Sequence, residues 1–140
     1  MRLPEITAAI VQTVLAHYPD VQAIYLFGSY GTEGEWPNSD VDIALLMTPE
    51  TSKQMGHLMT SPLRGALARL LERAVDLLNA RQVSTVFQKE IVMADRRIYT
   101  ASEYAADAFE VQTLSAYQKL NQERAEVLAE GLRSGRFYDV

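Results

Sequence analysis

Apolar residues recur at helical or strand spacing along the first half of the chain, and glycine and proline mark the breaks. In residues 4–17 they repeat every three or four positions, which predicts an amphipathic helix from Pro4 to His17. The apolar run of residues 21–27 ends at Gly28 and predicts a buried strand. Residues 40–47 alternate acidic with aliphatic side chains and then become wholly apolar, which indicates a second strand. Between them, residues 28–39 hold three glycines, a proline and an asparagine, which predict a long turn.

The second half of the chain predicts further helices and short strands. Ser61 followed by Pro62 is typical of a helix start, and leucines at helical spacing follow. Residues 75–78 predict a third strand or else prolong that helix, residues 84–93 predict a helix, and residues 97–100 predict a short edge strand. A long helix is expected to begin after Ser102, its cap, and to end at Gly131. We therefore predict an α/β (α+β) protein, a mixed sheet of three to four strands flanked by helices, as a single domain over residues 1–140.

The long C-terminal helix carries apolar residues on more than one side. One set includes Tyr104, Ala108 and Val111, and another includes Ala105, Phe109, Ala116 and Leu120. One side is expected to pack on the sheet, and the other either contacts a second protein or belongs to the same core.

Length and composition exclude several classes of protein. A chain of 140 residues with 48% hydrophobic and 22% charged residues is typical of one globular domain and not of a disordered tail. No apolar run approaches the roughly 20 residues that cross a bilayer, and the N-terminus lacks the unbroken apolar stretch of a signal peptide. With no cysteine there is no disulfide, thiolate metal site or cysteine nucleophile. We expect a cytoplasmic protein that does not engage a membrane.

The net charge of −5 is concentrated in the first part of the chain. Residues 1–52 contain one basic and seven acidic residues, a charge of −6, whereas residues 53–140 carry +1. A nucleic-acid interface needs clustered lysine and arginine, so we expect no direct contact with nucleic acid. Acidic side chains instead recruit a divalent cation before a phosphate approaches them.

The most informative segment is Gly28-Ser29, followed by ten residues and then by Asp40-Val41-Asp42. Because side chains alternate along a strand, Asp40 and Asp42 are expected on one face, where they repel unless a proton or cation intervenes. The glycine leaves room for a phosphate, and the serine adds a donor. Each motif alone is ordinary surface structure. Together, before a buried strand, they predict a metal-dependent phosphate site.

This combination resembles the nucleotidyltransferase superfamily to which DNA polymerase beta belongs, whose signature is a Gly-Ser, a spacer and an Asp-x-Asp on the next strand. The chain is most similar to the minimal nucleotidyltransferase (MNT) proteins, the antitoxins of HEPN–MNT toxin–antitoxin pairs. The resemblance implies the nucleotidyltransferase fold, Asp40 and Asp42 as catalytic metal ligands, and Gly28 and Ser29 as nucleotide-binding residues. It also implies two Mg²⁺ ions, or Mn²⁺, with ATP as the substrate.

The resemblance further implies a third carboxylate on a neighbouring strand, in an apolar context. Asp76, within the apolar run of residues 75–78, matches that position; the alternative is a surface aspartate that continues the preceding helix. A lone acid in an apolar run is seldom buried unpaired, which favours Asp76 as a catalytic metal ligand. Glu90 and Asp95 are the fallback candidates, and His57 is a weaker candidate for a general base.

The function that the resemblance implies is transfer of AMP from ATP to a tyrosine hydroxyl of a cognate HEPN ribonuclease toxin, which neutralises it. One alternative is a non-catalytic module that occludes the toxin, and the intact motif counts against it. Another is a small-molecule nucleotidyltransferase of the antibiotic-modifying kind. Such enzymes usually need an additional substrate domain, which 140 residues could supply only through a homodimer. Surface arginines that could reach a triphosphate are Arg64, Arg96 and Arg97.

Overall fold

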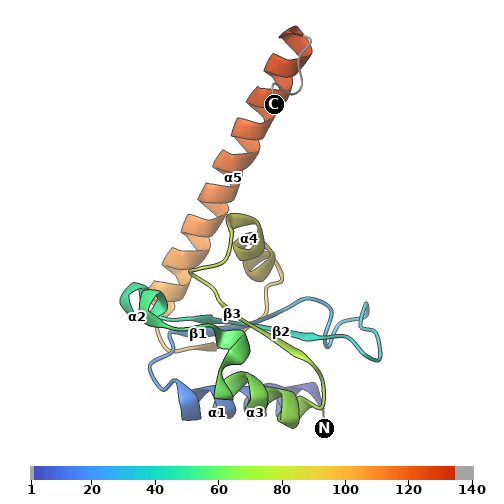
Figure 1. Cartoon of the computed structure of the whole chain (residues 1–140), viewed down its shortest axis with the longest axis vertical. Coiled ribbons are helices and arrows are strands. Elements are labelled where there is room, and N and C mark those ends of the chain that lie inside the picture. The colour runs from blue at the N-terminus through green and yellow to red at the C-terminus, as the bar shows by residue number, and fades with distance from the viewer. Residues whose placement is uncertain (1, 135–140) are drawn as a thin grey trace.

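A four-stranded mixed sheet forms the middle layer of the structure, a computed structural model that describes residues 2–134 (Figure 1). The strand order is β3-β2-β1-β4; β1 pairs antiparallel with β2 and with β4, whereas β2 and β3 are parallel. The elements in chain order are α1 (Leu3–His17), β1 (Ala23–Phe27), β2 (Val41–Leu46), α2 (Pro49–Gln54), the 3₁₀ turn η1 (Leu58–Thr60), α3 (Pro62–Leu71), β3 (Val75–Asn79), α4 (Thr85–Met93), β4 (Arg97–Thr100) and α5 (Glu103–Ser134).

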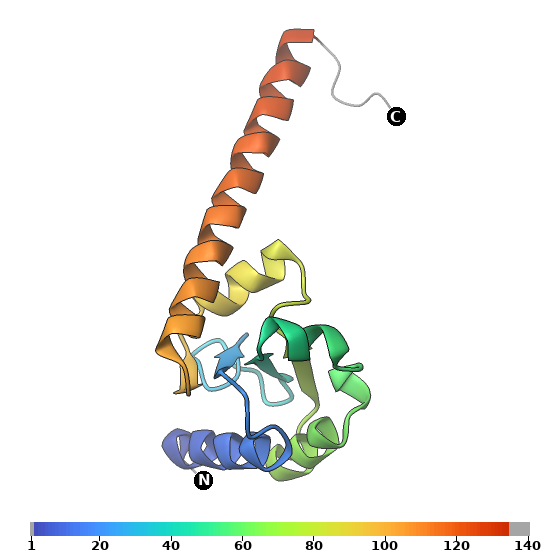
Figure 2. The ribbon, with the colours of Figure 1, turned by 90° about the vertical axis from the view of Figure 1, so that its left-hand side faces the viewer.

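Helices cover both faces of the sheet, which explains why its central strands are almost wholly apolar. Figure 2 shows α1 and α3 below the sheet and α4 with the start of α5 above it. Ile43 and Leu45 of β2 join the core on the α1–α3 side, together with Leu63 and Leu67 of α3. Ala44 and Leu46 alternate to the other face, where Phe109 of α5 packs. Every residue of β1 is buried, as the apolar run of residues 21–27 predicted.

Most of the predicted elements are confirmed. Ser61 caps α3 by accepting a hydrogen bond from the Arg64 backbone N–H, and residues 75–79 form a strand and do not prolong that helix. Strand β4 lies at one edge of the sheet, as predicted. Two elements were not predicted, α2 and η1, because their residues lack a clear apolar period. They form where Thr48 caps α2 and where Leu58 enters the core.

The C-terminal helix begins as predicted, with the Ser102 hydroxyl accepting from the Ala105 backbone N–H. The prediction that it ends at Gly131 is wrong, because α5 continues to Ser134. A glycine inside a helix costs only about 1 kcal/mol relative to alanine, which the helix-forming residues around it offset. The later part of α5 projects from the rest of the protein (Figure 1). Despite its length, α5 is too polar to cross a membrane, and no other helix within residues 2–134 is long and apolar enough to do so.

Candidate active site

The sheet brings the predicted carboxylates to one end of two adjacent strands. Asp42 in β2 and Asp76 in β3 are register partners, so both project from the face that α4 and α5 cover, and both are half-buried. Asp40 lies one residue before β2 and is exposed. We call Asp40, Asp42 and Asp76 the carboxylate cluster. The parallel pairing of β2 and β3 therefore places Asp76 where a third carboxylate was expected.

Gly28 lies directly against this cluster at the end of β1. Its φ is +72°, a left-handed conformation that glycine adopts without strain. A Cβ at this position would lie 2.0 Å from the Oδ2 atom of Asp42, far inside any permitted contact. The sequence suggested that this glycine makes room for a phosphate. The structure shows that it makes room for the Asp42 carboxylate, which any side chain at position 28 would displace.

The fold changes the electrostatics of the Asp42 carboxylate. Burial, together with the charge and hydrogen bonding of Asp76 and the charge of Asp40, raises its pKa to about 6. Within residues 2–134, none of the three carboxylates forms an ion pair with a lysine, arginine or histidine. The fold thus holds acidic groups together without supplying a cation of its own.

The cluster is not a preformed cage for a metal ion. In the part of the chain that the structure describes, no three His, Cys, Asp or Glu side chains are arranged as a complete metal site. The donor chemistry nevertheless fits Mg²⁺, which prefers oxygen ligands, keeps several waters and is commonly held by one or two carboxylates together with substrate phosphates. The mutual repulsion that raises the pKa of Asp42 is the interaction that such a cation would relieve.

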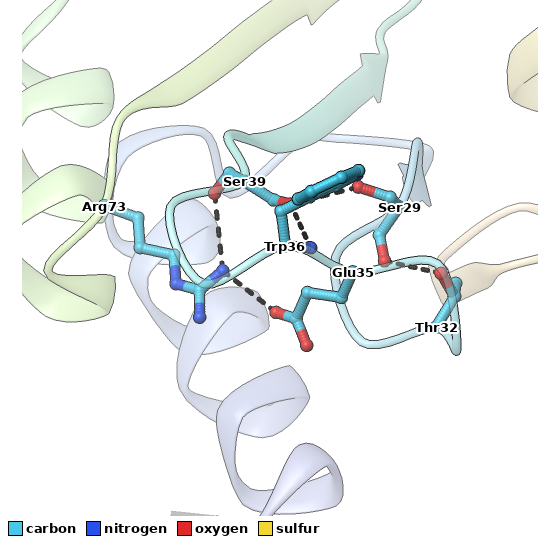
Figure 3. Close-up of polar contacts among 6 residues, drawn as sticks. All are labelled: Ser29, Thr32, Glu35, Trp36, Ser39 and Arg73. Carbon is cyan, nitrogen blue, oxygen red and sulfur yellow. Dashed lines mark hydrogen bonds and ion pairs between the residues drawn. The ribbon is translucent and has the colours of Figure 1, made fainter.

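The long turn between β1 and β2 is closed by its own polar contacts (Figure 3). The Ser29 hydroxyl donates to the Ser39 Oγ at 3.3 Å, and that same oxygen accepts the Trp36 backbone N–H at 2.7 Å. The Thr32 hydroxyl donates to the Ser29 carbonyl at 2.6 Å. Ser29 thus joins the two ends of the turn just before Asp40. The sequence did not indicate this contact, because Ser39 belongs to no recognisable motif.

Arg73, just before β3, braces the same turn from outside. Its Nη1 lies 2.9 Å from a Glu35 carboxylate oxygen and donates to the Ser39 carbonyl at 3.4 Å. Its guanidinium also stacks over the ring of Tyr30, 4.9 Å from the centroid, and Tyr30 is buried in the core. This arginine therefore fixes the turn relative to β3. Sequence analysis missed it because the partners are more than thirty residues away in the chain.

Two of the three candidate arginines are engaged by the protein itself. Arg64 donates through Nε to the Val75 carbonyl at 3.0 Å, and Arg97 pairs with Asp107 and Glu110. Arg96 differs, because both terminal nitrogens of its guanidinium are buried and have no hydrogen-bond partner. A Cβ on Gly31 would lie 3.0 Å from the Arg96 Nη2, so this unpaired cation lies beneath the turn.

The fallback acids occupy other parts of the structure. Glu90 is exposed on α4 and pairs with Lys89 at 2.8 Å, and Asp95 is an exposed turn residue with a φ of +54°. Neither is among the charges that raise the pKa of Asp42. His57 is an exposed residue that begins η1. The geometry therefore favours Asp76 over the other candidates.

The chain is similar to a known family of nucleotidyltransferases and to a known adenylyltransferase. The family model described as "Polymerase beta, Nucleotidyltransferase" matches residues 10–104, which include the turn, the carboxylate cluster and β4. The chain is 32% identical over 119 residues to the protein adenylyltransferase MntA of Shewanella oneidensis (strain MR-1), and the match covers 85% of this chain and 82% of MntA.

Solved structures show the same likeness in three dimensions. A toxin–antitoxin crystal structure with AMP-PNP contains a chain with 30% identity and a TM-score of 0.73, over 90% of this chain and 98% of that chain. A structure of the tri-AMPylated Shewanella oneidensis HEPN toxin in complex with its MNT antitoxin matches with 28% identity and a TM-score of 0.67, over 92% of this chain and 98% of that chain.

Proposed function

Because the chain belongs to the polymerase beta nucleotidyltransferase family, in the branch of the MNT antitoxin MntA, we propose that it transfers AMP from ATP to a tyrosine hydroxyl of a cognate HEPN toxin and thereby neutralises the toxin. The observation that carries this proposal is the register pairing of Asp42 with Asp76 beside Gly28. It brings together, at one end of the sheet, acidic groups of the kind that hold divalent cations for phosphoryl chemistry. We treat residues 1–140 as one minimal catalytic domain.

Each residue of the site has a role in this proposal. Asp40 and Asp42 would hold two divalent cations, Mg²⁺ or Mn²⁺, and Asp76 would add a ligand on the side of the acceptor. Two such cations supply positive charge to the attacking and leaving oxygens of an in-line displacement. Gly28 keeps the Asp42 carboxylate in place, and Ser29 orders the turn against which the triphosphate would lie.

The transfer forms one bond and breaks another. The tyrosine Oη bonds to the α-phosphorus of ATP, the bond from that phosphorus to the bridging oxygen of the β-phosphate breaks, and pyrophosphate leaves. The phenol proton passes to solvent. A free tyrosine has a pKa near 10 and is a weak nucleophile at neutral pH, so the divalent cations would supply the positive charge that favours the phenolate. The product carries a phosphodiester, which adds negative charge and bulk to a protein that must admit RNA phosphates.

The related complexes support transfer over simple occlusion, because one of them contains an AMPylated toxin. A direct test uses ATP labelled at either the α- or the γ-phosphate, incubated with the protein and its cognate HEPN toxin. We expect label on the toxin from the α-position only, with Mg²⁺ present and Asp40 and Asp42 intact. Label from the γ-position would indicate a kinase, and no label from either would indicate occlusion.

A further inference from the structure

A cavity of about 400 Å³ lies beside the outer edge of β3, apart from the carboxylate cluster. Its walls come from α2, from the residues that lead into η1, and from the second half of β3; they include Met55, Gly56, His57, Met59, Leu77 and Asn79. Residues 55–59 form a methionine-rich stretch, with Met55 and Met59 at its two ends. The structure gives it a definite place, because it follows the outer edge of β3.

Among residues 2–134, side chains and not a further strand cover this edge of β3. The Val75 carbonyl accepts from Arg64 Nε at 3.0 Å, and the Leu77 backbone N–H donates to the Met59 sulfur at 3.3 Å. A thioether is a weak acceptor, so a peptide carbonyl would be a better partner for this N–H. The edge is therefore covered in a way that another polypeptide is able to replace.

The cavity lies on the Asp76 side of the carboxylate cluster. In the strand order β3-β2-β1-β4, Asp76 and Gly28 lie on opposite sides of Asp42. If the triphosphate lies by Gly28, the acceptor approaches from the side of Asp76. Leu78, whose side chain lies on the same face of the sheet as Asp76, lines the cavity, and Leu77 of the opposite face lines it as well.

We propose that this cavity is the acceptor-side binding site and receives an apolar or aromatic side chain of the toxin segment that carries the modified hydroxyl. The inference rests on the proposed function, which fixes the acceptor side. It assigns the methionine-rich stretch to recognition of the polypeptide substrate.

The chemistry of the walls fits an apolar occupant. The polar groups at one end satisfy one another: the Ser52 hydroxyl donates to Asn79 Oδ1 at 2.8 Å, Asn79 Nδ2 donates to the Ser52 carbonyl at 3.0 Å, and Gln82 Nε2 donates to the Ser52 Oγ at 3.2 Å. This network leaves few polar groups that need a ligand. Met55, Met59 and Leu77 supply an apolar lining, and methionine side chains adapt readily to different partners.

Gly56 offers a way to block the cavity without disturbing the fold. A Cβ at Gly56 meets no atom within 4 Å, and its backbone is not in the left-handed region. Because the protein contains no cysteine, Gly56→Cys creates a single thiol for a bulky maleimide label. Met93→Cys is the matched control, since Met93 is 63% exposed on α4 and does not line the cavity.

The experiment measures the KM for the cognate HEPN toxin in AMP transfer and the toxin affinity without ATP. We expect labelling of Gly56→Cys to raise the toxin KM and to weaken the toxin affinity by about tenfold or more relative to the same variant without label, while the KM for ATP is unchanged. Labelled Met93→Cys should behave as the wild type.

Labelled Gly56→Cys with wild-type toxin KM and affinity would overturn the inference, as would equal losses in both labelled variants. If the wild type binds the toxin but transfers no AMP, the proposed function fails, and the affinity measurement still decides whether the cavity contacts the toxin.

Discussion

Two groups of acidic side chains lie on the same face of the sheet, and they differ in what neutralises them. In the first, Glu110 and Asp107 of α5 contact Arg97 of β4 at 2.7 and 3.2 Å. Glu110 also accepts the Tyr25 hydroxyl at 2.9 Å, and burial together with this contact raises the pKa of Tyr25. We call these four residues the anchor cluster. It attaches α5 to the sheet and supplies its own cation.

The carboxylate cluster is built in the opposite way. Burial and the repulsion from Asp76 and Asp40 raise the pKa of Asp42. No lysine, arginine or histidine of residues 2–134 forms an ion pair with any of these three acids. A fold that needed these acids only for stability would pair them, as it does around Arg97. The contrast indicates that the missing positive charge comes with a substrate or an ion.

The largest expected effect is on transfer by Asp76→Asn. The amide removes one negative oxygen on the acceptor side, which matters in the transition state more than in the bound state. We expect AMP transfer to fall by about a thousandfold or more, with ATP affinity within about threefold of the wild type. Single-turnover transfer and nucleotide titration measure the two quantities. Glu90→Gln and Asp95→Asn are the matched controls; a loss in either of them with full activity in Asp76→Asn would show that the third carboxylate is another residue.

Gly28→Ala should have the next largest effect. The added methyl group would overlap the Asp42 carboxylate and would also strain a left-handed backbone. Displacing a metal-binding carboxylate by about 1 Å is expected to reduce transfer by about a hundredfold. Gly34→Ala tests the same change in the same turn, where a Cβ would meet only the Thr32 hydroxyl at 3.8 Å, and it should leave the rate unchanged. Equal rates for both variants would contradict this account of Gly28.

Arg97→Met should affect stability and leave transfer intact. It leaves Glu110 half-buried without its cation, and we expect a loss of about 2 kcal/mol in the free energy of unfolding, less than for a fully buried pair. Urea denaturation measures this loss. Transfer per folded molecule, assayed well below the melting temperature, should match the wild type. A large fall in transfer with unchanged stability would mean that the anchor cluster takes part in the reaction.

Asp42→Asn should raise the stability of the protein, whereas Arg97→Met lowers it, and its effect should be the smallest. Because the folded-state pKa of Asp42 is raised, to about 6, protonation favours the folded state, and this contribution is lost as the pH rises through about 6. The asparagine amide stays neutral as the pH rises, so the variant does not lose this stability. We expect the variant to be more stable than the wild type by about 1 kcal/mol at pH 7.5, after allowance for solvent screening, and by much less near pH 4.

The dependence of stability on ligand provides a further test, with the wild type and a double variant of the carboxylate cluster. Mg²⁺ with ATP should raise the melting temperature of the wild type, since ligand at a hundredfold excess over Kd adds about 2.7 kcal/mol, whereas either added alone should do much less. An Asp40→Asn/Asp42→Asn double variant should gain little. Equal shifts in the two proteins would place the nucleotide away from the carboxylate cluster.

The parts of the molecule that followed from the sequence are those that local chemistry determines. Apolar runs specified β1 and β2, caps specified α3 and α5, and the Gly-Ser and Asp-x-Asp spacing placed the site at one strand end. Asp76 was predicted as the third carboxylate from its apolar surroundings and the family pattern, and the register of β2 with β3 puts it beside Asp42. What escaped prediction depends on contacts between distant segments. Arg73 over the turn and Arg97 under α5 have no local signature, and α5 passes through Gly131 because its neighbours favour the helix.

The central claim is that the protein inactivates its toxin by covalent transfer and not by remaining bound to it. The most direct measurement incubates the cognate HEPN toxin with a small fraction of its molar amount of this protein, ATP and Mg²⁺, removes the protein, and determines the intact mass and ribonuclease activity of the toxin. The account predicts a toxin whose mass has increased by whole AMP units and which stays inactive, and only when Asp40 and Asp42 are intact. A toxin of unchanged mass that regains activity after separation would contradict it.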